Sequence, residues 1–307
     1  RHPAVQQPHA ARRYGTETRM KVLAVINPRS GKGRAEDLRE TAIALAKQRG
    51  VELEVRTIAA QGDGMRFAQE AKDNGFQRII SIGGDGTLNA IAAGIVGSPL
   101  QLGIVPMGSG NGYARSLKLP QDPAKALELA FSGNARQMDV CYLNDRLFLG
   151  TAGVGFDAQV AWEFDKSEGR GMWNYMRLIT KHVLSAKPMR VVLKVNKETR
   201  EDKVLMLNFC NTREFGNGAV ISPGSLPDDG LAELRIVTKP PLLPMLMAFI
   251  RMYTGSIDAS PYLTNIVTDQ ATVYQDGLLA HLDGEPVQIG KEIQFRLEPK
   301  RLWVVVE

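Results

Sequence analysis

Three glycine-rich segments in the first third of the chain have the composition of turns that hold phosphate groups. They are 27–33 (NPRSGKG), 83–89 (GGDGTLN) and 106–112 (PMGSGNG). Each directly follows a short apolar run of the kind that forms a buried strand, at 20–26, 78–82 and 102–105. Because ligands of open α/β sheets bind at the carboxyl ends of the strands, we expect the three segments to lie together.

The segment 83–89 is the most specific of the three, because an acidic residue stands among its glycines. Thr87 stands where a helix begins, so nearby amides would face an anion with the helix dipole behind them. Asp85 would repel a phosphate group unless a cation lay between the two, which predicts a Mg²⁺-nucleotide with Asp85 acting on the metal or its waters. The alternative is that Asp85 only caps the helix.

The other two segments are weaker signals on their own. In 27–33, serine and glycine amides with Arg29 and Lys32 suit phosphate oxygens, but the residue order is not that of a Walker A loop. A solvated basic turn explains this segment equally well. In 106–112, Ser109 could donate to a phosphate, or the segment could be a flexible turn.

Alternating strand and helix signals surround these segments and predict a parallel sheet with right-handed crossovers. The expected helices lie at 36–49, 64–74, 87–96 and after Asp122, which precedes a proline as a helix cap does. From about residue 135 the pattern changes to short strand-like runs with turn signals, the last two of them at 292–297 and 302–306. Helical patches at 171–186 and 242–253 interrupt these runs. This pattern favours an antiparallel sandwich or barrel.

Composition and charge exclude several classes of protein. The chain has 307 residues, 44% of them hydrophobic and 23% charged, which suits two globular domains. Two cysteines, Cys141 and Cys210, are too few for a disulfide scaffold or a four-cysteine zinc site. Of the net charge of +5, residues 1–19 carry four arginines against one glutamate, or +3, so we expect no nucleic-acid partner. No apolar stretch reaches the roughly 18 residues of a membrane span.

Together the three segments resemble the diacylglycerol kinase catalytic domain superfamily, which includes bacterial lipid kinases, sphingosine kinases and ceramide kinases. Three more segments support the resemblance by their order and spacing: 152–158 (AGVGFDA), 226–234 (LPDDGLAEL) and 282–286 (LDGEP). The tail at 1–19 lacks hydrophobic periodicity, so we expect it to be disordered. The resemblance implies a three-layer α/β ATP-binding domain at 20–135, to which the chain end at about 298–307 could return. It also implies an antiparallel β-sandwich at 136–297 that binds the lipid substrate.

The resemblance implies ATP-dependent phosphorylation of a lipid hydroxyl, diacylglycerol-like or sphingoid, with Mg²⁺ and ATP as cofactors. Asp85 and Glu285 would be catalytic, with Glu285 as the general base. A second Mg²⁺ site would consist of Asp229 and the carbonyls of Leu226 and Leu231. The implied nucleotide contacts are Asn27, Ser30, Gly31, Thr57, Gly84, Asp85, Gly86, Thr87 and Ser109. By residue type alone, the sequences around Asp229 and Glu285 are also good turns.

One position departs from the family, since many members have aspartate where this chain has Gly112. That difference affects the expected lipid specificity and leaves the nucleotide chemistry intact. The alternatives are an NAD kinase-like enzyme, which shares the GGDGT loop, and a catalytically silent homologue that binds lipid or nucleotide.

For the partners, we expect ATP, a lipid substrate, a transient membrane surface and a possible homodimer. The expected location is cytoplasmic and peripheral at the inner membrane surface. Two apolar stretches have a second interpretation as membrane-facing helices, although we favour a core helix for 242–250 and a surface helix for 170–187.

Overall fold

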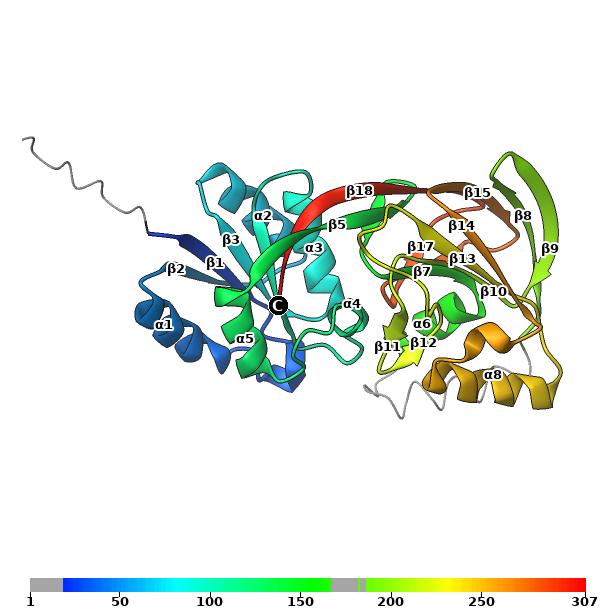
Figure 1. Cartoon of the computed structure of the whole chain (residues 1–307), viewed down its shortest axis with the longest axis horizontal. Helices are drawn as coiled ribbons and strands as arrows, with labels where there is room; N and C mark the ends of the chain where they lie inside the picture. Colours follow the sequence, from blue (N-terminus) through cyan, green and yellow to red (C-terminus); the bar gives the residue numbers. More distant parts are fainter. Residues whose placement is uncertain (1–18, 167–181, 183–185) are drawn as a thin grey trace, which may run out of the picture.

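The computed structural model describes residues 19–166, 182 and 186–307, which form two lobes connected by a pair of long strands (Figure 1). The expectations for the tail at 1–18 and for most of the helix at 170–187 fall outside the described residues. The described part of the chain has no helix of the length and apolar character needed to cross a bilayer.

The first lobe is a parallel sheet covered by helices on both faces. Its strands are β1 (Lys21–Ile26), β2 (Glu52–Thr57), β3 (Arg78–Gly83) and β4 (Gln101–Pro106), in the order β2-β1-β3-β4. Successive side chains of β1 point to opposite faces of the sheet, and helices cover both faces, which explains why residues 22–26 are all apolar. One face packs against α1 (Leu38–Arg49) and α5 (Pro123–Ser132), and the other against α2 (Asp63–Asp73) and α3 (Asp85–Ile95).

The second lobe is a sandwich of two sheets. In the part of the chain that is described, one sheet has six antiparallel strands in the order β14-β13-β10-β7-β16-β17. These strands are β7 (Thr151–Gly155), β10 (Met206–Cys210), β13 (Ala232–Val237), β14 (Leu263–Thr268), β16 (Leu279–Leu282) and β17 (Glu285–Gln288). The facing layer contains β8 (Met189–Val195), β9 (Glu198–Val204) and β15 (Gln270–Gln275). Between the layers, the rings of Phe209 and Phe295 stack with centroids 4.8 Å apart.

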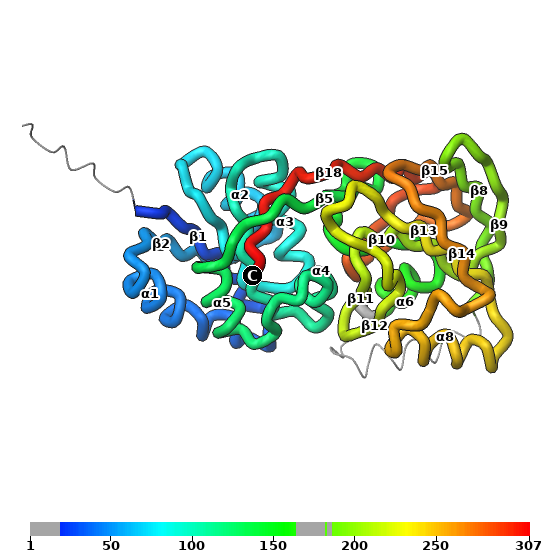
Figure 2. The backbone as a smooth tube through the Cα atoms, viewed as in Figure 1, coloured from blue at the N-terminus to red at the C-terminus, as the bar shows by residue number. Residues whose placement is uncertain are grey.

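Two long strands carry the backbone from one lobe to the other. β5 (Asn134–Leu143) leaves the first lobe, and β18 (Glu292–Val306) returns antiparallel to it. β18 pairs with β15 in the sandwich and with β4 in the first lobe, so that one sheet continues through both (Figure 2). This ribbon fixes the two lobes relative to each other through backbone hydrogen bonds.

Several further elements complete the described part of the chain. They are α4 (Gly112–Ser116), β6 (Arg146–Phe148), α6 (Phe156–Lys166), β11 (Glu214–Gly216), β12 (Ala219–Val220), α8 (Leu242–Thr254) and the 3-10 turns Ser30–Gly33 and Ile257–Ala259. The fold class predicted from the sequence, an α/β domain plus an antiparallel β-sandwich, is confirmed.

Three local expectations were wrong. Helix α3 begins at Asp85, two residues before the expected start, with Gly84 as its N-cap. The expected strands at 292–297 and 302–306 are one strand, β18, with a register irregularity between Glu298 and Leu302. Helix α8, which we expected to be a core helix, has no buried residue along its fully described length.

Candidate active site

The three glycine-rich segments meet at one edge of the parallel sheet, where β1, β3 and β4 end. Asn27 follows β1, and its amide Nδ2 donates to Thr87 Oγ1 in the second segment over 2.8 Å. The backbone N–H of Asn27 also donates to the carbonyl of Ile82 at the end of β3, over 2.9 Å. These bonds hold the first segment against the start of α3.

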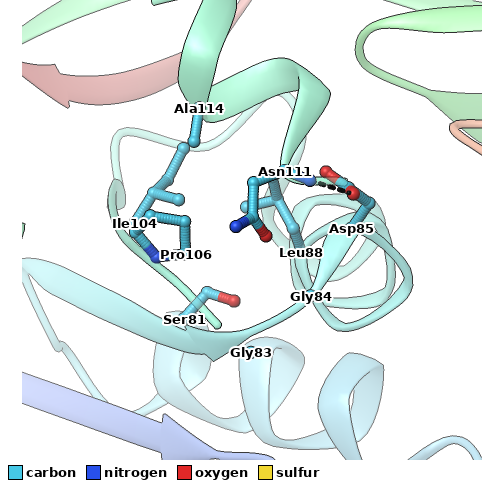
Figure 3. Close-up of a pocket in the computed structure, with 9 residues that line it drawn as sticks. All are labelled: Ser81, Gly83, Gly84, Asp85, Leu88, Ile104, Pro106, Asn111 and Ala114. Atoms are coloured by element: carbon cyan, nitrogen blue, oxygen red, sulfur yellow. Dashed lines mark hydrogen bonds between the residues drawn. The ribbon is translucent and has the colours of Figure 1, made fainter. Parts of the chain in front are cut away.

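The second and third segments touch through their backbones. A methyl group added to Gly84 would lie 3.2 Å from the Cα atom of Gly108, so side chains at either position would separate the loops. The N–H of Asn111 donates to Asp85 Oδ2 over 3.0 Å, and Asn111 Oδ1 accepts from the N–H of Gly108 over 2.8 Å. Figure 3 shows Asn111 and Asp85 side by side at the rim of a small pocket between these loops.

Asp85 is held by the third segment rather than by a capping bond. Gly84 occupies the N-cap position, and its helix start shows no side-chain cap bond. Burial raises the pKa of Asp85 to about 7, and the nearby charges of Asp283 and Glu285 act in the same direction. Three carboxylates from two lobes therefore gather beside the glycine loops.

The second lobe contributes a tight turn between β16 and β17. Asp283 and Gly284 have φ angles of +49° and +84°, a pair typical of a type I′ hairpin turn. The Asp283 carboxylate accepts from the backbone N–H groups of Leu149, Gly150 and Thr151 over 2.8–2.9 Å. It also accepts from Asn89 Nδ2 in α3 over 2.9 Å, a bond between the two lobes.

Glu285 follows this turn directly and reaches the second glycine segment. A methyl group added to Gly86 would lie 3.2 Å from Glu285 Oε1. The carboxylate of Glu285 thus packs against the first turn of α3. The β16–β17 turn thus places Glu285 beside the glycine loops of the other lobe. All the residues that meet here were expected from the sequence: Asn27, Gly84, Asp85, Gly86, Thr87 and Glu285.

The other residues of the first lobe lie further along the same edge. Ser30 and Gly31 belong to the turn after β1, and Gly31 packs against Met107 of the third segment. Ser109 is exposed at the tip of that segment. Thr57 ends β2, one strand beyond Asn27, and its hydroxyl accepts from Arg39 over 2.6 Å.

The residues expected to bind a second Mg²⁺ lie in the loop before β13. Asp229 Oδ1 accepts from the N–H of Leu231 over 3.0 Å, and the side chains of Leu226 and Leu231 are exposed. The loop is attached to β5 and β18 by Asp139, which accepts from the N–H groups of Gly230 and Lys300 over 2.7 and 2.8 Å. Among the described residues, no group of three or more His, Cys, Asp and Glu side chains is arranged to hold a metal ion.

Comparisons with known proteins agree with this architecture. Residues 21–143 match the diacylglycerol kinase catalytic domain, and residues 150–306 match the YegS C-terminal NAD kinase beta sandwich-like domain. A "Probable lipid kinase YegS-like" of Citrobacter koseri is 31% identical over 292 residues, covering 91% of this chain and 94% of that protein. A "Probable lipid kinase YegS" of Salmonella arizonae is 32% identical over 294 residues, with the same coverage. The chain belongs to the YegS-like branch of the diacylglycerol kinase family.

Solved structures show the same fold. A diacylglycerol kinase from Bacillus anthracis superposes with a TM-score of 0.76 at 21% identity, covering 94% of this chain and 97% of that one. The resemblance to the diacylglycerol kinase superfamily is confirmed, and the chain is an enzyme of the kinase class.

The sequence alone assigns no role to three residues of this candidate site: Asn89, Asp283 and Asn111. Asn89 follows the glycines of the second segment with no chemical signal of its own, and Asp283 is a residue type common in turns. Their hydrogen bond joins positions 194 residues apart, and no local pattern signals such a contact. Asn111, likewise unassigned, links two glycine segments through both its backbone and its side chain.

Gly112, the departure from the family pattern, touches the second lobe. A methyl group there would lie 2.9 Å from the carbonyl oxygen of Phe215 and 3.0 Å from that of Glu214, in the hairpin β11–β12. The glycine thus allows the hairpin backbone to approach the third segment. An aspartate at this position would require the hairpin to move away.

We expect Gly112→Ala to push the β11–β12 hairpin from the third segment and to lower turnover about tenfold, because small displacements of positioned groups are costly in catalysis. Hydrogen exchange of the amides around Phe215 should rise together with this loss. Gly64→Ala in α2 is the matched control, since a methyl group there lies 3.4 Å from its nearest neighbour. Unchanged turnover and exchange in Gly112→Ala would show that the hairpin contact is unimportant.

Proposed function

We propose that this chain transfers the γ-phosphoryl group of Mg·ATP to a hydroxyl group of a lipid, with Glu285 as the general base. The carboxylate of Glu285 beside Gly86 is the observation that carries the proposal. It supports a reaction at the boundary of the lobes, with the nucleotide bound by 20–135 together with the returning chain end at 298–307. The acceptor then comes from the side of 136–297.

Backbone N–H groups are the proposed phosphate ligands. The amides at the start of α3, from Gly84 to Thr87, lie at the positive end of the helix dipole. The turn with Asn27, Ser30 and Gly31 and the tip with Ser109 border the same edge and add donors. Thr57 is the outermost of these proposed contacts, because it ends the edge strand β2. Its hydroxyl already accepts from Arg39.

The proton of the acceptor hydroxyl goes to Glu285 in this proposal. As the proton leaves, the hydroxyl oxygen forms a bond to the γ-phosphorus, and the bond from that phosphorus to the β-γ bridging oxygen breaks to release ADP. Proton transfer to a positioned carboxylate makes a weak alcohol nucleophile competent. The four hydrogen bonds that Asp283 accepts fix the chain two residues before the base.

The described side chains do not form a metal site of their own, so we propose that a divalent cation binds here together with the phosphate oxygens of ATP. Asp85, Asp283 and Glu285 lie close enough for their charges to raise the pKa of Asp85, and oxygen donors of this kind are those that Mg²⁺ prefers. We assign Asp85 to the metal or to its waters. When bound, Mg²⁺ would neutralise charge on the transferred phosphate. For the second Mg²⁺, at Asp229 and the carbonyls of Leu226 and Leu231, the proposal rests on the resemblance to the family.

The acceptor is proposed to be a lipid because the relatives are described as lipid kinases and because α8 offers a surface for a bilayer. Leu242, Leu243 and Leu246 of α8 are 64%, 69% and 56% exposed. Residues 239–257 contain two cations and no acidic residue, which suits an anionic membrane. α8 lies beside the hairpin β11–β12, whose strand β11 borders α4 of the active site (Figure 1). We propose that α8 lies on the cytoplasmic face of the inner membrane, where ATP is available.

We expect Glu285→Gln to lower kcat by about 10²–10⁴, because the amide cannot accept the proton, and to leave ATP binding unchanged. The assay is transfer from γ-labelled ATP to diacylglycerol, monoacylglycerol, sphingosine and ceramide in mixed micelles. The control is the dissociation constant of Mg·ATP, measured for both proteins by calorimetry. Unchanged turnover would place the base elsewhere.

The same assay includes NAD, because the second domain matches a type described as NAD kinase-like. Labelled NADP with no labelled lipid would replace the proposal by the NAD kinase alternative. We expect labelled phosphate in the lipid and no labelled NADP.

We expect the double variant Leu243→Glu, Leu246→Glu to lose sedimentation with vesicles of phosphatidylglycerol and phosphatidylethanolamine, since two charges replace apolar contacts with the acyl region. Transfer to a short-chain, water-soluble acceptor should persist. Val267→Glu is the control, because Val267 is exposed on β14, outside α8. Sedimentation with vesicles equal to that of the wild type would show that α8 is not the surface through which the protein binds the membrane.

A further inference from the structure

A row of three polar residues and one glycine crosses one face of the six-stranded sheet and ends beside the turn that precedes Glu285. Arg235, Asn208, Gly153 and His281 are successive register partners on β13, β10, β7 and β16. Direct register partners in a sheet lie on the same face. The neighbours on the other face, including Phe209 and Val154, form the apolar core of the sandwich.

Gly153 makes room for three polar side chains to meet. A methyl group at Gly153 would overlap Asn208 Nδ2, Asp157 Oδ2 and His281 Nε2 at once. Asp157 comes from the first turn of α6, which follows β7 directly. All three side chains are buried, with exposed fractions of 0% for Asn208 and 3% for His281. Buried polar groups of this kind are costly unless they are paired.

Hydrogen bonds give each group of the cluster a defined role. His281 Nε2 lies 2.9 Å from Asp157 Oδ2, and Asn208 Nδ2 donates to the same oxygen. Asp157 Oδ1 accepts from the N–H of Ala158 over 2.9 Å. On the other side of the ring, His281 Nδ1 accepts from the N–H of Gly284 over 3.4 Å. Because Nδ1 accepts, the imidazole proton is on Nε2, where it donates to Asp157.

We infer that His281 and Asp157 are positioning residues for Glu285. Asp157 keeps His281 in the Nε2–H form, which leaves the Nδ1 lone pair free for the amide of Gly284, the residue directly before Glu285. Asp283 is held from one side by the amides of 149–151 and by Asn89, and Gly284 is held from the other side by His281. This inference rests on the proposed role of Glu285 as the base.

Two substitutions separate the two nitrogen atoms of the ring. His281→Gln keeps a donor near the Nε2 position, toward Asp157, and loses the acceptor for Gly284. His281→Asn keeps an acceptor near the Nδ1 position and loses the donor. We expect His281→Gln to lower kcat about five- to tenfold, the scale of one hydrogen bond, with an unchanged KM for ATP. His281→Asn should lower kcat clearly less than His281→Gln does. Equal effects of the two substitutions, or a loss expressed only in KM, would overturn the inference.

A double-mutant cycle separates this inference from the proposed function. If His281 acts through Glu285, His281→Gln should cause no further loss of kcat in the Glu285→Gln background. Equal losses in both backgrounds would overturn the positioning role. If Glu285→Gln alone had no effect on turnover, the proposed base would fail, and this result would be visible before the cycle is completed.

A spectroscopic measurement on the unaltered protein does not depend on the activity of the variants. Histidine labelled with ¹⁵N distinguishes protonated from unprotonated ring nitrogens, and the spectrum of either folded His281 variant assigns the signal. We expect protonated Nε2 and unprotonated Nδ1 for His281. The opposite tautomer would leave Gly284 without its acceptor and would overturn the inference, whatever the activity of the variants.

Discussion

The candidate active site depends on one carboxylate that is hydrogen-bonded to both lobes. Asp283 accepts from three consecutive amides at the start of β7 and from Asn89 in α3 of the first lobe. Hydrogen bonds to an ionised acceptor are stronger than neutral ones, so this cluster is a firm attachment point. Since Glu285 lies two residues further on, the attachment also brings its carboxylate to Gly86. The backbone ribbon of β5 and β18 sets the lobes side by side, and Asp283 connects the two parts of the site.

The same arrangement concentrates negative charge where phosphate is expected. The raised pKa of Asp85 reflects its burial and its proximity to Asp283 and Glu285. Such a cluster repels a triphosphate as it stands, and a divalent cation makes carboxylates and phosphate compatible. The amides at the start of α3 have the opposite polarity, so the site combines fixed donors for phosphate oxygens with carboxylates that suit a metal and a base.

Much of the fold could be predicted because its signals are local. The apolar run of β1 and the aspartate that caps α5 each depend on a few neighbouring residues. The Asp122 carboxylate, for example, accepts from the N–H of Lys125 over 3.0 Å. The gathering of Asn27, Asp85 and Thr87 also followed from one rule, that parallel strands end at a common edge.

What could not be predicted depends on distant partners. The bond between Asn89 and Asp283 and the cluster of Asp157, Asn208 and His281 arise only when strands far apart in sequence come into register. The exposure of α8 was missed for a different reason: an apolar helix has the same sequence whether it packs in a core or faces a membrane. The approach of the β11–β12 hairpin to Gly112 likewise depends on a loop in the other lobe.

A crystal structure with Mn²⁺ and a non-hydrolysable ATP analogue tests the central claim most directly, because anomalous scattering locates the metal independently of the protein. We expect the γ-phosphate between the start of α3 and Glu285, the metal on the Asp85 side of the phosphate, and the hydrogen bond from Asn89 to Asp283 intact. A γ-phosphate that points away from Glu285 while that bond is intact would contradict the account.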